Sequence, residues 1–260
     1  MESLAPLNNL AKILLELRKS IPSATPAIAF LGYTDLMLSA AEWAELGVDE
    51  SQLANRPNFA NLRAIHGRPD VTVVPTLASA LQALIGDSFT LTVFDFTQYE
   101  GSEVPHDFNF PLPAPFLNAF DIVVDNGTCE HIFNIAQALV NVLKMLRPGG
   151  LVYHNGPLCW PNHGFYGYNP TLFADFYEDN GCRLLDLFLN ARTFSNGAPH
   201  HLSVSGIPKY DHFTLAQALH NNSDLLHLQY NLAVVATKLQ ELPQTVYPIQ
   251  HKYRNPADWQ

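Results

Sequence analysis

Apolar residues along this chain recur at two different spacings, and each spacing predicts one kind of element. Within residues 1–20 they stand three or four positions apart, which is typical of an amphipathic helix. Residues 27–31, 90–96 and 120–124 are short apolar runs rich in β-branched or aromatic side chains, and they predict buried strands. The first third of the chain and its centre therefore contain both helices and strands.

The clearest strand–helix–strand unit begins at the strand formed by residues 120–124. Residues 132–146 carry one apolar stripe at helical spacing, and Pro148-Gly149-Gly150 predicts the end of that helix. Residues 151–154 predict the next buried strand. Two buried strands joined through a helix imply a right-handed parallel crossover. Because strands and helices alternate in this way, we predict an α/β fold with a mostly parallel sheet.

The other predicted elements are shorter. Ser39 and Glu42 form a capping box that predicts the start of a helix. Helices are expected at residues 40–46, 77–85, 172–178 and 213–219, with a broken helical piece at 53–66, and strands at 71–74, 104–108, 183–188 and 232–237. We predict a single domain over residues 1–260, with a loop at 190–208 and a loop-and-helix insertion over 190–230 before the last strand.

Length, composition and charge agree with one α/β domain. The 260 residues are 47% hydrophobic, which is enough to bury a substantial core. Acidic residues outnumber basic ones by 24 to 14, so the basic footprint of a nucleic-acid-binding protein is missing. No apolar run approaches the roughly 20 residues of a membrane helix, and the N-terminus lacks a signal-peptide pattern. We expect a cytoplasmic protein that binds neither nucleic acid nor membrane.

Cysteine and histidine spacing predicts neither a disulfide framework nor a metal site. Cys129, Cys159 and Cys182 are odd in number and widely spaced, which favours a reducing compartment. Of eleven histidines only His200 and His201 are adjacent, and neighbouring residues of an extended chain point to opposite sides. No His-x-x-x-His or His/Cys pair stands at ligand spacing, so we predict no metal.

Polar residues follow the predicted strands at the point where each strand ends. Gly32 follows residues 27–31, and Asp95, Asp107 and Asp125 end three further strands. In an open parallel sheet, ligands bind beyond the carboxyl ends of the strands, where the strand order changes direction. Carboxylates accept hydrogen bonds from ribose hydroxyls or an exocyclic amine, and glycine lets the backbone approach a ligand. This pattern favours a nucleoside ligand.

Residues from about 90 to 181 resemble the class I S-adenosylmethionine-dependent methyltransferases. The motifs that carry the resemblance are Phe120-Asp121-Ile122-Val123-Val124-Asp125-Asn126-Gly127-Thr128-Cys129-Glu130-His131, Leu146-Arg147-Pro148-Gly149-Gly150, and, in a bacterial subset of these enzymes, His163-Gly164-Phe165-Tyr166 with Asn169-Pro170-Thr171-Leu172-Phe173. The resemblance implies a Rossmann-like three-layer sandwich with a mostly parallel seven-stranded sheet. Residues 232–237 would be its antiparallel last strand.

The resemblance also implies S-adenosylmethionine as the cofactor, and it assigns residues to it. Asp95, with Phe96 beside it, would hold the ribose hydroxyls, and Asp107 with the amide of Phe108 would contact the adenine. The remaining cofactor-binding positions, around the methionine part, would be Gly32, Tyr33, Asp125, Asn126 and Gly127. Asp125 has the alternative of serving only as a cap for the following turn.

The loop after the predicted strand at 151–154 supplies the candidate acceptor site. His163 would overhang the ligand crevice, where it could deprotonate or orient an acceptor; its alternative is a hydrogen bond to loop backbone. Trp160, Phe165 and Tyr166 would bind the acceptor or, alternatively, pack the loop itself. His131 is expected instead to pack under the sheet edge at the start of a helix.

Two functions follow from this pattern. The first is methyl transfer from S-adenosylmethionine to oxygen or nitrogen of a small-molecule acceptor. The second arises because Phe30-Leu31-Gly32-Tyr33-Thr34-Asp35 has one glycine where the family has a Gly-x-Gly-x-Gly turn. Either that turn is rebuilt, or the cofactor site is degenerate and the chain is a non-catalytic binding or partner subunit. Tyr33 filling the methionine pocket would favour the second function, and an open cleft lined by Asp95, Asp107 and Asn126 the first.

Overall fold

The computed structural model describes most of the chain. It describes residues 10–56, 68–98, 104–160, 162–193, 200–204 and 229–254, and only the backbone of residues 191–193, 200–204 and 229. The predicted helix at 213–219 and most of the helical piece at 53–66 lie outside the described residues.

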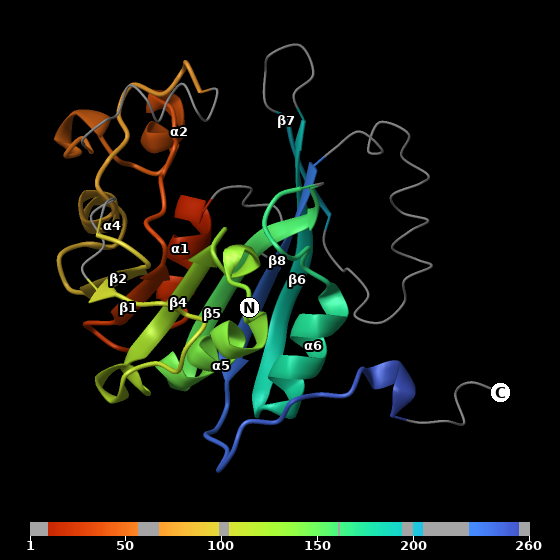
Figure 1. Ribbon diagram of the computed structural model, residues 1–260. Helices are drawn as coiled ribbons and strands as arrows, with labels where there is room; N and C mark the ends of the chain where they lie inside the picture. The colour runs from red at the N-terminus through yellow and green to blue at the C-terminus, as the bar shows by residue number, and fades with distance from the viewer. Residues whose placement is uncertain are drawn as a thin grey trace.

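Eight strands form one sheet within the described part of the chain. They are β1 (Ala27–Leu31), β2 (Thr90–Asp95), β3 (Val104–Pro105), β4 (Phe120–Asn126), β5 (Leu146–Cys159), β6 (Cys182–Thr193), β7 (His200–Val204) and β8 (Gln229–Lys238). Their order is β3-β2-β1-β4-β5-β8-β6-β7 (Figure 1). Strands β1 to β5 pair in parallel, whereas β8 runs antiparallel to both β5 and β6. The predicted Rossmann-like class with an antiparallel last strand is confirmed, and β7 adds an eighth strand at the edge.

Helices cover both faces of this sheet and make three layers. The described α-helices are α1 (Leu10–Lys19), α2 (Ala40–Glu45), α4 (Leu77–Ile85), α5 (Ile135–Met145) and α6 (Pro170–Asp179), and short 3-10 turns are η2 (Glu50–Gln52), η3 (Ala114–Phe116), η4 (Cys129–His131) and η7 (His251–Tyr253). One apolar core joins α1, α2 and α4 to the sheet, and a second core joins α5 and α6 to the opposite face. None of the described helices is long and apolar enough to span a lipid bilayer.

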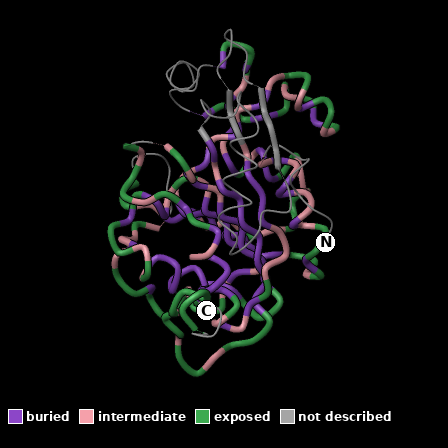
Figure 2. Tube along the Cα trace, turned by 90° about the vertical axis from the view of Figure 1, so that its right-hand side faces the viewer, coloured by how far each residue is buried: buried purple, intermediate pink, exposed green. Residues whose placement is uncertain are grey.

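The side-chain alternation of β4 shows why both cores form. Ile122 and Val124 point into the core with α1 and α4, while Phe120 and Val123 point into the core with α5 and α6. A strand buried on both faces needs apolar residues at successive positions, which is the unbroken run that the sequence shows. The central strands are accordingly buried, and the exposed residues lie on the outer loops (Figure 2).

Helix starts are fixed by local side-chain chemistry, as the capping box predicted. The Ser39 hydroxyl accepts from the amide of Glu42, and the Glu42 carboxylate accepts from the amide of Ser39 at 2.7 Å. Asn134 caps α5 in a similar way through the amide of Gln137. These bonds satisfy amides that the first helical turn leaves without partners.

Several predicted boundaries differ from the structure. The strand predicted at 104–108 ends at Pro105, so Asp107 lies in the loop after β3 and does not end a strand. Residues 71–74 form no strand; among the described residues the one isolated bridge beside them joins Asn55 to Pro75, and Val71 and Val74 are buried from a segment without regular structure. Residues 190–208 are not loop throughout, since β6 extends to Thr193 and β7 begins at His200. Helix α5 ends at Met145 and strand β5 begins at Leu146, so Pro148-Gly149-Gly150 lies in the irregular start of the strand and does not end the helix as predicted.

Candidate cofactor and acceptor site

The carboxyl ends of β1, β2 and β4 border a cleft of about 360 Å³. Strand β1 lies between β2 and β4, so the cleft is at the position where strand order changes direction. Its wall consists of the turns after β1 and β4, the end of β2 and the loop after β3. The volume falls within the roughly 300–1,000 Å³ that is usual for small-molecule sites.

Every predicted cofactor-binding residue except Asp125 lies in the wall of this cleft. They are Gly32, Tyr33, Asp95, Phe96, Asp107, Phe108, Asn126 and Gly127. Residues separated by nearly a hundred positions thus meet at one edge of the sheet. The wall also contains residues to which the sequence assigned no contact with the cofactor, among them Thr34, His106, Asn109, Thr128 and His131.

The turn after β1 requires its single glycine. Gly32 has a φ of +73°, and a Cβ added there would stand 2.6 Å from Oγ1 of Thr128. Its amide donates to the carbonyl of Phe94 at 2.7 Å, and the Thr128 hydroxyl donates to the carbonyl of Leu31 at 2.6 Å. Gly32 therefore lets the turns after β1 and β4 approach closely, in a conformation that side chains disfavour.

The next residue of this turn, Tyr33, contacts the start of α4 and the side chain of Arg56. The Tyr33 hydroxyl accepts from the amide of Leu77 at 2.8 Å, at the first residue of α4. The guanidinium of Arg56 lies 4.1 Å from the centre of the Tyr33 ring and forms an ion pair with Asp35. These contacts tether the tyrosine toward α4, and the cleft between β1 and β4 stays open.

Asp95 and Asp107 both line the cleft, and each uses one carboxylate oxygen in a contact within its own loop. Oδ1 of Asp95 accepts from the amide of Thr97 at 3.4 Å. Oδ1 of Asp107 accepts from the amide and the side chain of Asn109 at 2.9 and 2.7 Å. Within the described residues, Oδ2 of neither carboxylate has a hydrogen-bond partner, so both can accept from a ligand.

His106 and Phe96 complete this side of the cleft. Nε2 of His106 is buried, yet it has no hydrogen-bond partner among the described residues. Burial lowers the pKa of His106, which favours the neutral ring. Buried polar atoms normally have a partner, so this nitrogen indicates a missing polar contact. The Phe96 side chain is 73% exposed and offers an aromatic surface at the rim.

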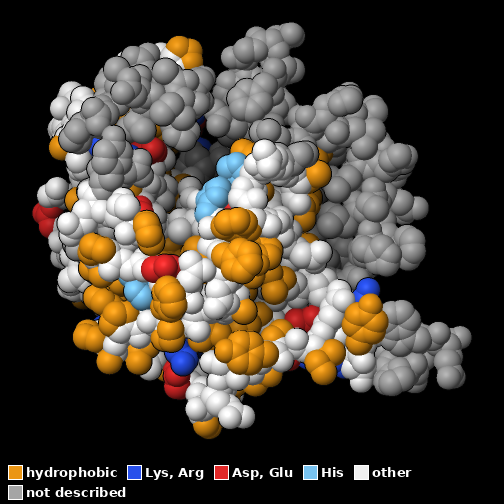
Figure 3. All heavy atoms as spheres, in the orientation of Figure 1, with side chains coloured by type: hydrophobic (Ala, Val, Ile, Leu, Met, Phe, Trp, Pro, Cys, Tyr) orange, Lys and Arg blue, Asp and Glu red, His pale blue; other side chains and the backbone are white. Residues whose placement is uncertain are grey.

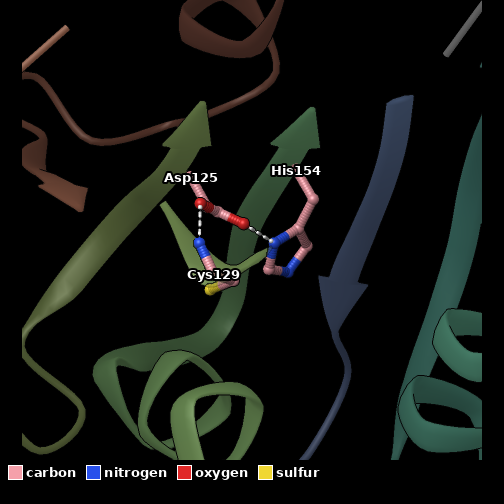
Figure 4. A group of neighbouring side chains, drawn as sticks. All are labelled: Asp125, Cys129 and His154. Atoms are coloured by element: carbon pink, nitrogen blue, oxygen red, sulfur yellow. Dashed lines mark hydrogen bonds and ion pairs between the residues drawn. The ribbon is translucent and has the colours of Figure 1, made fainter. Parts of the chain in front are cut away.

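Asp125 lies behind the cleft wall, fully buried between β4 and β5. Its Oδ1 accepts from the amides of Thr128 and Cys129, both at 3.1 Å. Its Oδ2 lies 2.7 Å from Nδ1 of His154, the residue opposite it on β5 (Figure 4). The same oxygen accepts from the Tyr168 hydroxyl at 2.7 Å. The alternative role of Asp125 as a cap fits this position, and contact with a ligand in the cleft does not.

Hydrogen bonding also decides the charge of Asp125. Burial opposes ionisation, but the bonds to His154 and Tyr168 outweigh it and lower the pKa of Asp125. His154 continues the network to the Tyr177 hydroxyl at 2.5 Å. Nε2 and Nδ1 of the imidazole are thus both in use, and the network is closed within the core.

Glu130, His131 and His163 form a second group beside the cleft. Oε1 of Glu130 lies 3.9 Å from Nε2 of His131 and 3.7 Å from Nε2 of His163, and the two imidazole centres are 5.0 Å apart. Burial, followed by the negative charge of Asp125, raises the pKa of Glu130 to about 7. Burial also lowers the pKa of His131, with a further contribution from His163. The expectation that His131 packs under the sheet edge is wrong, since its side chain is 50% exposed and lines the cleft.

The loop that carries His163 is attached to η4 through its backbone. The amide of Phe165 donates to the carbonyl of Glu130 at 2.8 Å. Gly164 has a φ of +71°, and a Cβ there would stand 2.8 Å from that same carbonyl. The close approach of this loop, which only glycine allows, places His163 over Glu130.

The predicted acceptor residues surround His163 outside the wall of the cleft. The Trp160 ring centre is 4.8 Å from that of His163, and its buried Nε1 has no partner among the described residues. Phe165 is 64% exposed and meets Phe133 edge to face, with ring centres 5.6 Å apart. The Tyr166 hydroxyl donates to the carbonyl of Phe133 at 2.7 Å. Figure 3 shows histidine side chains at the surface beside a group of apolar ones.

Comparison with known proteins adds structural likenesses of low similarity. No family model matches the chain, and no curated protein matches it. A protein from Bacillus halodurans assigned as a methyltransferase has 11% identity and a TM-score of 0.44, over 87% of this chain and 99% of that one. The carbon methyltransferase CurJ has 8% identity and a TM-score of 0.45, over 92% and 54%. The cyclase SpnF has 11% identity and a TM-score of 0.38, over 88% and 80%. The fold assignment therefore rests on the strand order of this chain's own sheet.

Proposed function

We propose that this chain is an S-adenosylmethionine-dependent methyltransferase that acts on oxygen or nitrogen of a small-molecule acceptor. The observation that carries the proposal is the open cleft at the ends of β1, β2 and β4, with Asp95 and Asp107 in its wall. This is the position at which open α/β sheets bind nucleotides.

The groups around the cleft suit an adenosine. The free oxygen of Asp95 would accept from the ribose hydroxyls, and the free oxygen of Asp107 would accept from the adenine amine. The unpartnered Nε2 of His106 would make a polar contact, and Phe96 offers its ring to the base. Because Gly32 has no side chain, the backbone of the turn after β1 itself lines the cleft there and would lie close to a ligand.

The residues of the chain would then mainly orient the two reactants. S-adenosylmethionine supplies a sulfonium-bound methyl group that is already activated for transfer. Since the methyl group needs little further activation, holding donor and acceptor in line is the main contribution of the protein. His163 would orient the acceptor or remove its proton, and Trp160, Phe165 and Tyr166 would bind its apolar part.

The position of Tyr33 favours this function over a non-catalytic partner subunit. A degenerate site would have the tyrosine ring in the methionine pocket. Instead its hydroxyl is bonded to Leu77 at the start of α4, and Arg56 covers its ring. The turn with one glycine is rebuilt, and the cleft remains large enough for a ligand.

Calorimetric titration with S-adenosylhomocysteine and with S-adenosylmethionine tests the proposal. We expect saturable binding of both, and at least about tenfold weaker binding by Asp95→Ala, because a hydrogen bond to a charged group contributes about 1.5–3 kcal/mol. The matched control is Asp87→Ala, which removes an exposed aspartate before the other end of β2 and should leave affinity unchanged.

Two results would count against the proposal. Absence of binding by the wild-type chain at millimolar ligand would refute the cofactor. Equal affinity of Asp95→Ala and Asp87→Ala would refute the assignment of the ribose site while leaving the cofactor itself standing.

A further inference from the structure

Three potential metal ligands from two segments meet beside the cleft, although His163 stands 32 positions after His131 in the sequence. Glu130 and His131 lie in η4, and His163 follows β5 by four positions. One oxygen of Glu130 and one ring nitrogen from each histidine all lie within 4.8 Å of one another. We propose that Glu130, His131 and His163 bind a divalent transition-metal ion.

The distances suit a shared ion better than direct hydrogen bonds. Oε1 of Glu130 is 3.7 Å from Nε2 of His163 and 3.9 Å from Nε2 of His131, and both separations exceed a hydrogen bond. Zinc binds nitrogen and carboxylate oxygen at about 2.0–2.2 Å, so two ligand atoms of a tetrahedral ion lie roughly 3.3–3.6 Å apart. The two distances from Glu130 are within a few tenths of an ångström of that range, and the two histidines would turn their rings to bring their nitrogens, which lie within 4.8 Å of each other, to the same ion.

The carboxylate of the group is already held by a second set of contacts. Oε2 of Glu130 accepts from the Tyr168 hydroxyl at 3.2 Å, and the same hydroxyl donates to Asp125. The Glu130 side chain is 1% exposed, so it has one position, with Oε1 toward the two histidines. Hydrogen-bonded carboxylates and fixed backbones around the ligands are what orient a metal site.

Two imidazoles and one carboxylate indicate the class of ion. This donor set is typical of catalytic zinc and of non-haem iron(II), and it leaves at least one coordination position open. His131 lines the cleft, so an ion held by it would stand at the border between the cleft and the exposed rings around His163. A role for the ion in catalysis rests on the proposed methyl transfer. In that reaction the open coordination position would receive the oxygen of an acceptor hydroxyl and favour loss of its proton to solvent. His163 would then act on the acceptor through the ion.

A second close group, Asp125, Cys129 and His154, does not make a comparable site. Its ligand atoms also lie within 4.8 Å of one another, but all three residues are buried. Both Asp125 oxygens already accept two hydrogen bonds each, counting His154 as a donor, and burial raises the pKa of the Cys129 thiol (Figure 4). An ion there would have to replace a closed network.

Metal binding by the full chain, with no S-adenosylmethionine present, tests this proposal separately from the proposed function. The chain is treated with a chelator, dialysed, and titrated with Zn²⁺ by calorimetry and with Co²⁺ by visible absorption. We expect one saturable site whose Co²⁺ spectrum shows four- or five-coordination. His163→Ala and His131→Ala should each weaken binding at least about tenfold, since loss of even an indirect ligand contact has effects of that size.

The controls separate the site from other histidines and from misfolding. His251→Ala removes a histidine of η7 at the other end of the chain and should bind as the wild type does. Glu130→Gln keeps the size of the side chain and an oxygen for the Tyr168 hydroxyl, and it should lose the site. If that variant does not fold, the two exposed histidine variants still decide the question. Absence of a saturable site in the wild-type chain, or binding that His131→Ala and His163→Ala leave unchanged, would overturn the proposal.

Discussion

Asp95 and Asp125 both stand at the carboxyl ends of parallel strands, but their surroundings give them different roles. Asp95 ends β2 one position beyond the last residue paired with β1, because β1 ends at Leu31 opposite Phe94, and its carboxylate borders the cleft. Asp125 lies in β4 opposite His154 of the long strand β5, and Tyr168 covers it from the other side. An acid at a strand end is therefore available to a ligand only where the neighbouring strand is too short to cover it.

The surroundings of Glu130 are intermediate between those of Asp125 and those of Asp95. It is buried like Asp125, yet only Oε2 has a hydrogen-bonding hydroxyl, and Oε1 faces two histidines at distances beyond hydrogen bonding. The buried network thus binds Oε2 of Glu130, whereas Oε1 faces the two histidines beside the cleft. The comparison predicts that substitutions at these acids affect stability, binding or both according to their neighbours.

The largest expected effect is the loss of Asp125. Asp125→Ala should lower the free energy of unfolding by about 3–5 kcal/mol, because several buried donors lose their acceptor, and each unsatisfied buried group costs about 1–3 kcal/mol. The matched variant Asp107→Ala, in the cleft wall, should change it by less than about 0.5 kcal/mol. Urea denaturation of both variants measures the difference. Equal destabilisation would contradict the division into structural and ligand-facing acids.

A smaller effect is expected at the turn after β1. Gly32→Ala should destabilise the fold by about 1–3 kcal/mol, since the residue has a positive φ and its Cβ would meet Thr128. Gly47→Ala is the control, because Gly47 has a similar φ of +74° but nothing within 4 Å of its Cβ. Thermal unfolding should show Gly32→Ala to be the less stable variant, and cofactor affinity should fall in that variant alone. If both lose stability equally, the contact with Thr128 is unimportant.

The smallest predicted effect concerns pH. The pKa of Glu130 is raised from 4.5 to about 7 in the folded chain, so between these values the native state holds a proton that the unfolded state has released. This contribution to stability is present at low pH and is lost as pH rises toward 7. In chelator-treated protein, Glu130→Gln should reduce the fall in unfolding free energy between pH 5 and 7 by on the order of 1 kcal/mol.

Chemical denaturation of the wild type and Glu130→Gln across that pH range checks this prediction. Asp125, His131, His163 and Tyr168 face Glu130 in both proteins, so the difference between the two curves isolates Glu130. Parallel curves would show that Glu130 titrates in the folded state as it does in the unfolded one.

The fold could be predicted well because its signals are local. The unbroken apolar runs gave β1 and β4, and the capping box at Ser39 gave the start of α2. The failures concern segments whose structure depends on pairing with another part of the chain. Val71 and Val74 look like a strand, but among the described residues only an isolated bridge between Asn55 and Pro75 forms beside them. Strand β7 was missed because residues 190–208 were all predicted as loop, although only six positions separate β7 from the end of β6.

The site could be predicted only where strand ends determine it. Asp95 and Asp107 follow from the rule that parallel strands end at one edge, and both lie in the cleft wall. The group of Glu130, His131 and His163 could not be found from spacing, because 32 positions separate the two histidines and the approach depends on Gly164. The adjacent Glu130-His131 pair, followed by a histidine in the loop after the next strand, is the signal that would have indicated it.

A crystal structure of the chain with S-adenosylhomocysteine tests most directly whether the cleft at the carboxyl ends of β1, β2 and β4 binds an adenosine. We predict that the ribose hydroxyls lie within hydrogen-bonding distance of the Asp95 carboxylate and the adenine beside Asp107, with Asp125 still bonded to His154. An adenosine bound at another place, or a cleft that stays empty at saturating ligand while Asp95 faces only solvent, would contradict the proposal.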